Sequence, residues 1–191
     1  MRALWFDTPL GAMVALGSAQ TLRGLHFGGA KHLPDLQGCE DGRGCLLLRR
    51  VQRQVGEYFE GHRPAFDVPL DHEGTALQKA VWLALADITV GTTISYSELA
   101  ARVGAPRAVR AVAQAVGRNP WTLIRPCHRV IGSNGSLTGF AGGLERKSAL
   151  LAHEARMARE RGAAEVAQGF ARQKSADITP MRTPPLPARS R

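Results

Sequence analysis

The chain has 191 residues, of which 44% are hydrophobic and 21% charged, a composition typical of a folded globular protein. No apolar run reaches the ~20 residues that a membrane-spanning helix needs, and the first residues lack the basic-then-apolar order of a secretion signal, so we expect neither a membrane protein nor a secreted one. Three cysteines cannot build a disulfide framework, and their odd number leaves a free thiol, which favours a reducing cytoplasm.

The formal net charge is +9, and it is unevenly distributed. Residues 1–75 are close to neutral, whereas residues 76–155 and 156–191 each carry an excess of Lys and Arg. This division is expected if one module meets a polyanion such as nucleic acid while another supports it. Solvated basic surface is the alternative interpretation, and charge alone does not separate the two.

The first part of the chain is predicted to hold a small sheet and one helix. Short apolar stretches in residues 3–28, punctuated by Gly and Pro, predict two or three antiparallel strands. Residues 28–45 are polar and rich in Gly, which predicts a loop, and the helical spacing of apolar residues from Leu46 predicts a helix that ends near Gly61. Segment 64–74, with two Pro and one Gly, is the predicted linker, and we place a domain boundary near residue 72.

The middle of the chain is predicted to be helical. A helix capped by Thr75 or Gly74 runs to about Ile88, and two further helices in residues 95–119 are separated by the short turn 104–106, with Pro106 opening the second. This is a helix-turn-helix pattern. Its second helix carries a basic stripe beside small residues that would let a DNA backbone approach closely, although a solvated helix face would look the same. The stripe comprises Arg107, Arg110, Gln114 and Arg118, and the small residues are Ala108, Ala111 and Ala115.

Cys127 lies at a predicted stiff bend between Pro126 and His128. The flanking Arg125 and Arg129 are cations, which would lower the pKa of its thiol and favour a nucleophilic thiolate. A buried, inert cysteine is the alternative.

A carboxylate that could orient His128 comes from the last predicted helix, which begins near Leu144 and turns Glu154 to the same face as its leucines. Because a carboxylate among leucines needs a partner, His128 is a candidate, and Lys147, Arg146 or water are the alternatives. Past about Gly169 the chain is basic and rich in Pro without a means of burying surface, which predicts a disordered tail within residues 159–191.

Several of these segments resemble one known family. The run Pro126–Val130 (P-C-H-R-V) resembles the signature of the O6-alkylguanine-DNA alkyltransferases, also called methylated-DNA–protein-cysteine methyltransferases. Residues 94–120 resemble that family's helix-turn-helix with its Asn hinge, and residues 142–154 resemble its closing helix. Residues 7–11 and 58–82 resemble its N-terminal domain and domain connection, so the resemblance spans about residues 3–156.

The resemblance implies a DNA-repair protein that moves the alkyl group of O6-alkylguanine, and as a further candidate of O4-alkylthymine, irreversibly to Cys127. Each molecule acts once on duplex DNA, after the damaged nucleotide is rotated out of the helix, and needs neither cofactor nor metal. The implied fold is α/β: a supporting domain at 1–72 with a small antiparallel sheet (ribonuclease H-like), a helical DNA-binding domain at 73–158, and the tail 159–191. We expect a cytoplasmic monomer in the absence of DNA.

The resemblance also assigns roles to residues. His128, acting through a water and anchored by Glu154, takes the thiol proton. Tyr96 helps to rotate the nucleotide and donates a proton near the departing base, Arg110 fills the gap left in the base stack, and Asn119 braces the turn before the active-site segment. The remaining expected DNA contacts are Arg107, Ala108, Ala111, Ala115, Arg118 and Arg129, and the expected base pocket comprises Val130, Phe140, Ala141 and Lys147.

Two departures from the family pattern stand near the cysteine. Phe140-Ala141 replaces a tyrosine followed by a small residue such as serine, and Arg125 replaces an aliphatic residue. Two rival functions are a DNA-binding regulator with a buried, inert Cys127 and a cysteine hydrolase that uses Cys127, His128 and Glu154. Family relatives that bind damage without transfer carry tryptophan in place of the cysteine, and Cys127 argues against that reading. The spacing of Cys39 and Cys45 does not match a recurrent zinc site.

Overall fold

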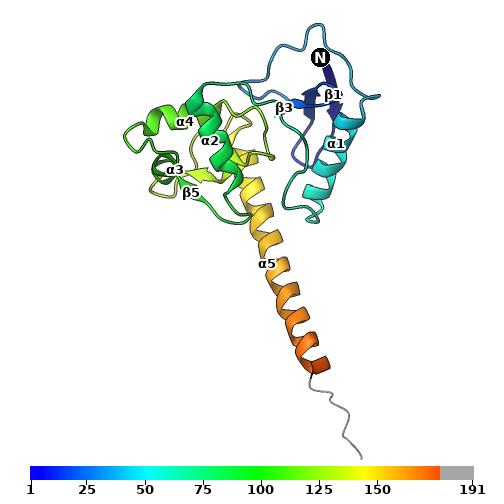
Figure 1. Cartoon of the computed structure of the whole chain (residues 1–191), viewed down its shortest axis with the longest axis vertical. Coiled ribbons are helices and arrows are strands. Elements are labelled where there is room, and N and C mark those ends of the chain that lie inside the picture. The colour runs from blue at the N-terminus through cyan, green and yellow to red at the C-terminus, as the bar shows by residue number, and fades with distance from the viewer. Residues whose placement is uncertain (177–191) are drawn as a thin grey trace, which may run out of the picture. The chain divides into compact units, whose positions relative to one another are not determined.

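The computed structural model describes the backbone of residues 1–176 and the side chains of residues 1–164. Residues Met1–Met157 form one compact unit, and a second unit begins at Ala158. The α/β fold class is confirmed: the first unit combines a small sheet with helices (Figure 1). In the part of the chain that the structure describes, no helix is long and apolar enough to cross a membrane.

The N-terminal sheet has the strand order β3-β2-β1-β4. Strands β1 (Arg2–Phe6), β2 (Met13–Gly17) and β3 (Leu22–Phe27) pair antiparallel, as the sequence predicts. Strand β4 (Glu40–Asp41) pairs parallel to β1 inside the segment predicted as a loop. Its two residues are exposed acids without apolar alternation, and it is held to β1 by backbone hydrogen bonds and by the exposed ion pair between Arg2 and Glu40.

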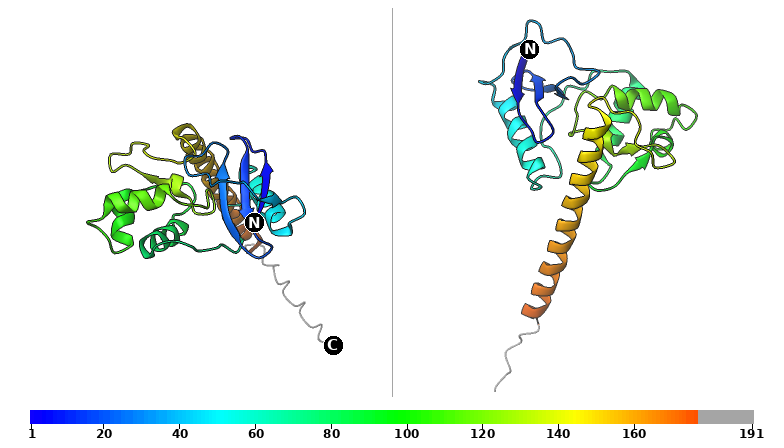
Figure 2. Two further views of the ribbon diagram at one scale, coloured as in Figure 1. Left: turned by 90° about the horizontal axis from the view of Figure 1, so that it is seen from above. Right: turned by 180° about the vertical axis from the view of Figure 1, so that it is seen from behind.

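Helix α1 (Leu46–Phe59) contacts β1 and β2 and buries its apolar face against the sheet (Figure 2). Val51, Val55 and Tyr58 are fully or almost fully buried at the spacing that the sequence shows, so the predicted amphipathic helix is confirmed.

Three helices pack together in the second half of the unit: α2 (Ala76–Ala86), α3 (Tyr96–Arg102) and α4 (Val109–Gly117). Thr75 and Ser95 begin α2 and α3 with capping boxes, which satisfy backbone N–H groups at the helix starts. The predicted turn 104–106 is too short: α4 begins only at Val109, because a turn closed by the Ala108 N–H to the Ala105 carbonyl precedes it. The helix-turn-helix assignment of α3 and α4 stays a prediction.

The segment after α4 ties the helices to the sheet. Leu25 of β3 bridges to Trp121, whose indole nitrogen donates to the Leu22 carbonyl at 3.0 Å. Strands β5 (Ile94–Ser95) and β6 (Val130–Ile131), which the sequence did not reveal, form a second, parallel sheet of two strands beside a single 3-10 turn at Cys127–Arg129. The core is therefore shared by both halves, and the domain boundary near residue 72 stays a prediction.

Helix α5 (Leu144–Ala176) extends past the point where the sequence predicts a disordered tail. That expectation is wrong for the residues between Gly169 and Ala176, because a helix that is already formed adds further residues without a new nucleation step. The rest of the predicted tail, 177–191, lies outside the described residues.

Candidate active site

The backbone around Cys127 is sharply bent. Pro126 has φ −76° and ψ 68°, and the Cys127 N–H donates to the Arg125 carbonyl at 2.7 Å, which is the geometry of an inverse γ-turn. Upstream, Leu123 holds a φ of 72° although it is not glycine, with its side chain buried in the core. Packing fixes this path, and Cys127 is left 7% exposed.

Asn119 holds the bend from the end of α4. Its side-chain nitrogen donates to the Arg125 carbonyl at 2.7 Å and to the Trp121 carbonyl at 3.4 Å, while its oxygen accepts from the Trp121 N–H at 3.1 Å. The side chain is buried, so these bonds replace the ones that water would supply. Asn119 thus lies where the resemblance places a brace for the turn.

Behind Cys127 lies a buried polar group of four side chains, which we call the Glu154 cluster: Tyr58, His128, Arg129 and Glu154. The Glu154 carboxylate accepts hydrogen bonds from His128 Nε2 and from the Tyr58 hydroxyl, each at 2.8 Å. Arg129 donates to both carboxylate oxygens, at 2.7 and 2.8 Å. All four side chains are buried.

These contacts decide the protonation of Glu154. Burial alone would raise the pKa of the Glu154 carboxyl, but the hydrogen bonds and charges of His128 and Arg129 outweigh it and hold the pKa well below its usual range. The alternative partners are wrong: Lys147 donates to the Val130 and Thr138 carbonyls, and Arg146 donates to the Leu10 and Gly142 carbonyls.

The ionised carboxylate fixes the tautomer of His128. Because a carboxylate only accepts, Nε2 carries the hydrogen, and Nδ1 is left with a lone pair. Nδ1 is buried and has no hydrogen-bond partner among the described residues. Burial lowers the pKa of His128 despite the opposing effect of Glu154, so the imidazole is neutral at pH 7 and Nδ1 can accept a proton.

The Cys127 thiol differs from the sequence expectation. Burial raises its pKa, and the Asn119 side chain and the Lys147 ammonium only partly oppose this effect. The expected lowering by Arg125 and Arg129 is wrong, because Arg129 is engaged by Glu154 and by the Ile88 carbonyl. Arg125 is not among the groups that act on the thiol, and the charge that acts on Arg125 itself is that of Asp87. A buried thiol needs a base to become a nucleophile.

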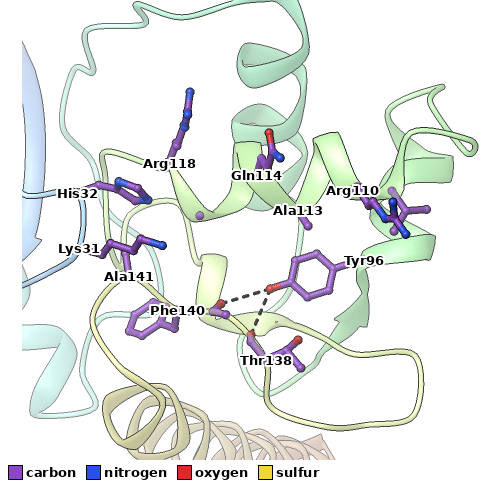
Figure 3. A pocket seen from close by; sticks show the side chains of 13 residues that line it. Lys31, His32, Tyr96, Arg110, Ala113, Gln114, Arg118, Thr138, Phe140 and Ala141 are labelled. Carbon is purple, nitrogen blue, oxygen red and sulfur yellow. Dashed lines mark hydrogen bonds between the residues drawn. The ribbon is translucent and has the colours of Figure 1, made fainter.

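Between α4, Tyr96 and residues 138–141 lies a cavity of about 680 Å³, which we call the basic pocket (Figure 3). The Tyr96 hydroxyl, from the start of α3, points across it to the Thr138 and Gly139 carbonyls at 3.2 and 3.3 Å. The pocket takes basic side chains from α4 and from a loop of the N-terminal sheet, and no acidic side chain lines it. Its lining comprises Lys31, His32, Tyr96, Val109, Arg110, Ala113, Gln114, Gly117, Arg118, Thr138, Gly139, Phe140 and Ala141.

The expected DNA contacts fall into two groups. Arg107, Arg110, Ala111 and Arg118 are exposed, and Ala108 is half-buried, so these positions on and before α4 are open to a ligand. Ala115 and Arg129 are buried, with the Ala115 carbonyl accepting from the Trp82 indole at 2.9 Å and Arg129 inside the Glu154 cluster, so the structure gives no support to DNA contacts by these two side chains. Ala115 belongs to the buried face of α4 together with Val112 and Val116, and Arg129 lies outside this helix, in the turn Cys127–Arg129.

The expected base-pocket residues also divide. Phe140 and Ala141 line the basic pocket, whereas Val130 and Lys147 are buried and absent from its lining. Burial lowers the pKa of the Lys147 ammonium to about 8, and its two carbonyl bonds hold β6 against the loop that contains Thr138.

Comparison with known proteins identifies the family. The family model described as the DNA-binding domain of 6-O-methylguanine DNA methyltransferase matches residues 76–156. A methylated-DNA–protein-cysteine methyltransferase of Mycolicibacterium paratuberculosis is 41% identical over 150 residues, which cover 78% of this chain and 90% of that relative. The chain belongs to this methyltransferase family. The inducible member from Bacillus subtilis is 44% identical over 152 residues, covering 74% of this chain and 85% of that one.

A solved member of the methyltransferase family has the same fold. The crystal structure of Mycobacterium tuberculosis OGT in complex with DNA superposes with a TM-score of 0.77 at 39% identity, covering 82% of this chain and 94% of that one. The likeness therefore includes the N-terminal sheet as well as the helices.

Sequence reasoning missed Tyr58, Lys31 and His32 at this methyltransferase site. Tyr58 continues the apolar face of α1, and a hydroxyl on a buried face requires a partner, which is a signal that could have found it. Lys31 and His32 stand in an aperiodic loop and gave no signal. Among the described residues, no three His, Cys, Asp or Glu side chains are grouped so that they could hold a metal ion.

Proposed function

We propose that the protein repairs O6-alkylguanine in duplex DNA by transferring the alkyl group to Cys127 in a single, irreversible step. The observation that carries the proposal is the arrangement of His128 beside Cys127, with Nε2 held by ionised Glu154 and Nδ1 carrying an unused lone pair. This is a general base beside a thiol that needs one.

The reaction balances without a cofactor. The thiol proton passes to His128 Nδ1 through a water, and the thiolate sulfur attacks the alkyl carbon. The carbon–O6 bond breaks, its electron pair remains on the base, and one proton restores guanine, so an alkyl group and a proton exchange places. The Tyr96 hydroxyl, whose bonds to two carbonyls are long, delivers the proton near the departing base, and the proton that His128 took from the thiol returns through water to restore the Tyr96 hydroxyl. The thioether does not reverse, so each molecule acts once.

The basic pocket receives the damaged nucleotide. A stacked O6 group cannot reach a buried cysteine, so the nucleotide leaves the helix at a cost of a few kcal/mol. Arg110, exposed at the mouth of the pocket, fills the space it leaves, and Phe140 and Ala141 contact the base. O4-alkylthymine is a second substrate of the same chemistry.

The exposed side of α4 supplies the main DNA contact. Arg107, Arg110 and Arg118 neutralise phosphates, and the small Ala108 and Ala111 allow the helix to lie close to the minor groove. All groups of the Glu154 cluster come from one chain, so a monomer suffices. The DNA substrate and three free cysteines fit action in the cytoplasm.

The fate of the DNA tests this proposal. A duplex with one O6-methylguanine is incubated with increasing protein and then digested to nucleosides, with Cys39→Ala as a control for a half-buried thiol elsewhere in the chain. We expect guanine to appear one for one with protein, and in equal amounts with Cys39→Ala. Binding without conversion would support the regulator, and many conversions per molecule would support a hydrolase-like catalyst, so either result overturns the proposal.

A further inference from the structure

A loop of the N-terminal sheet forms one wall of the basic pocket. Directly after β3, the Lys31 N–H donates to the Ala141 carbonyl at 3.0 Å. Arg146 makes a second attachment, because its Nη1 donates both to the Gly28 carbonyl at 3.4 Å and to the Gly142 carbonyl at 3.0 Å. The loop is therefore fastened to the segment that carries Phe140 and Ala141.

This attachment brings two further basic side chains to the pocket. In Figure 3, Lys31 and His32 lie across the pocket from Tyr96, and the amine end of Lys31 is turned toward it. Both side chains are exposed, and Lys31 Nζ makes no hydrogen bond or ion pair with any described residue. Arg110 of α4 and Arg118, which follows α4, also line the pocket, and no acidic residue is in its lining.

Several unpaired cations around one cavity repel one another, and an anion relieves that repulsion. The alkylated base that enters the pocket is neutral, so the anion belongs to the nucleic-acid backbone. An ammonium on a long stem binds phosphate as a point charge. We propose that Lys31, with His32 beside it, binds the phosphate next to the extruded nucleotide, so that the N-terminal half takes part in lesion capture rather than only supporting the helices. This inference rests on the proposed function.

The first test replaces Lys31 with Met and uses Lys79→Met, an exposed lysine of α2 outside the pocket lining, as the matched control. Two quantities are followed against salt concentration: the rate constant of transfer from a duplex with one O6-methylguanine, and the affinity for that duplex measured in a Cys127→Ser background. Loss of one phosphate contact lowers the slope of log affinity against log salt by about 0.9 and the affinity at low salt by about tenfold. We expect these changes for Lys31→Met, and neither of them for Lys79→Met.

A second test places the contact. A neutral methylphosphonate replaces, one at a time, each of the two phosphates that flank the lesion. At one of these two linkages, the methylphosphonate should reduce the affinity of the unchanged protein by the same factor as Lys31→Met reduces it on ordinary DNA. The same methylphosphonate should not reduce the affinity of Lys31→Met any further. The proposal would be overturned if Lys31→Met had the affinity and the salt slope of the unchanged protein. It would also be overturned if the methylphosphonate at either linkage reduced the affinity of Lys31→Met by as large a factor as that of the unchanged protein. Absence of transfer by the unchanged protein would instead overturn the proposed function, while the affinity measurements still decide the role of Lys31.

Discussion

The Glu154 cluster and the basic pocket are built on opposite principles. Behind Cys127, every charged group of the cluster is buried and has a partner inside the protein. In the basic pocket, Lys31, Arg110 and Arg118 are exposed cations without an acidic neighbour in the lining.

We infer from this difference that the Glu154 cluster serves the chemical step and that the basic pocket serves DNA binding. A buried cluster whose charged groups are all paired keeps its geometry and protonation state before a substrate arrives, and His128 Nδ1 is the one position left open to accept a proton. Unpaired cations at a surface acquire their partner from the ligand, and their contribution varies with salt. Changes in the cluster should therefore reduce both stability and reaction rate, whereas changes in the pocket should reduce binding and leave stability intact.

The largest effect is expected for Glu154→Gln. The amide cannot compensate buried Arg129, and breaking a buried pair costs about 3–5 kcal/mol of unfolding free energy. Loss of the group that orients His128 slows transfer by about 100-fold or more. Urea unfolding and single-turnover rates measure the two effects, with exposed Glu145→Gln of the same helix as control. A Glu154→Gln protein that is as stable and as active as the unchanged protein would show that the cluster does not hold His128 ready for proton transfer.

Tyr58→Phe gives an intermediate effect that shows in the pH profile. The phenyl ring retains the packing against Phe59 and Phe66 but removes a donor from Glu154. The carboxylate then attracts the His128 proton more strongly, so the pKa of His128 rises. The transfer rate should fall as the pH is lowered through the pKa of His128, because a protonated imidazole cannot take the thiol proton. In the unchanged protein that pKa is lowered, so the rate should stay constant to below pH 6.5, whereas in Tyr58→Phe the rate should begin to fall at a higher pH. Identical profiles would assign Tyr58 to packing only.

Arg110→Ala should change recognition without changing stability. Because the side chain is exposed, the unfolding free energy should stay within about 0.5 kcal/mol. The transfer rate on duplex DNA should fall about tenfold, since the gap left by the nucleotide is no longer filled. Thermal melting and single-turnover rates, with exposed Arg102→Ala as control, measure this; a large loss of stability would contradict the division between the two regions.

The smallest effect is expected for Arg107→Ala. Arg107 is exposed before α4 and lies outside the basic pocket, so it should neutralise a phosphate away from the lesion. Affinity should fall equally for damaged and undamaged duplexes, and the salt slope should decrease by about 0.9. Fluorescence titration of both duplexes tests this, and a loss confined to damaged DNA would move Arg107 into lesion recognition.

The reactive segment was largely predictable from the sequence. Cys127 and His128 are neighbours, and helical periodicity placed Glu154 on a buried face, where it needs a partner. The prediction failed for Arg129, because the sequence pattern did not show that this arginine shares the Glu154 carboxylate with its neighbour His128 and is buried there.

Long-range contacts were beyond the sequence pattern. Tyr58 reaches Glu154 across 96 positions, and Lys31 meets the pocket only because backbone bonds fasten its loop to Ala141. Strand β4 was not predicted because its two residues show no apolar alternation. The full length of α5 was not predicted because the helix continues past the point where the composition of the chain changes.

The mass of the protein itself tests the central claim most directly. The chain is incubated with excess duplex carrying one O6-methylguanine, and intact mass and peptide mapping follow, with an undamaged duplex and Cys127→Ser as controls. We predict a gain of one methylene mass per chain, on the peptide that contains Cys127, which stops after a single event and is absent from both controls. An unchanged mass while the DNA is repaired, or a methyl group on Cys39 or Cys45, would contradict the account.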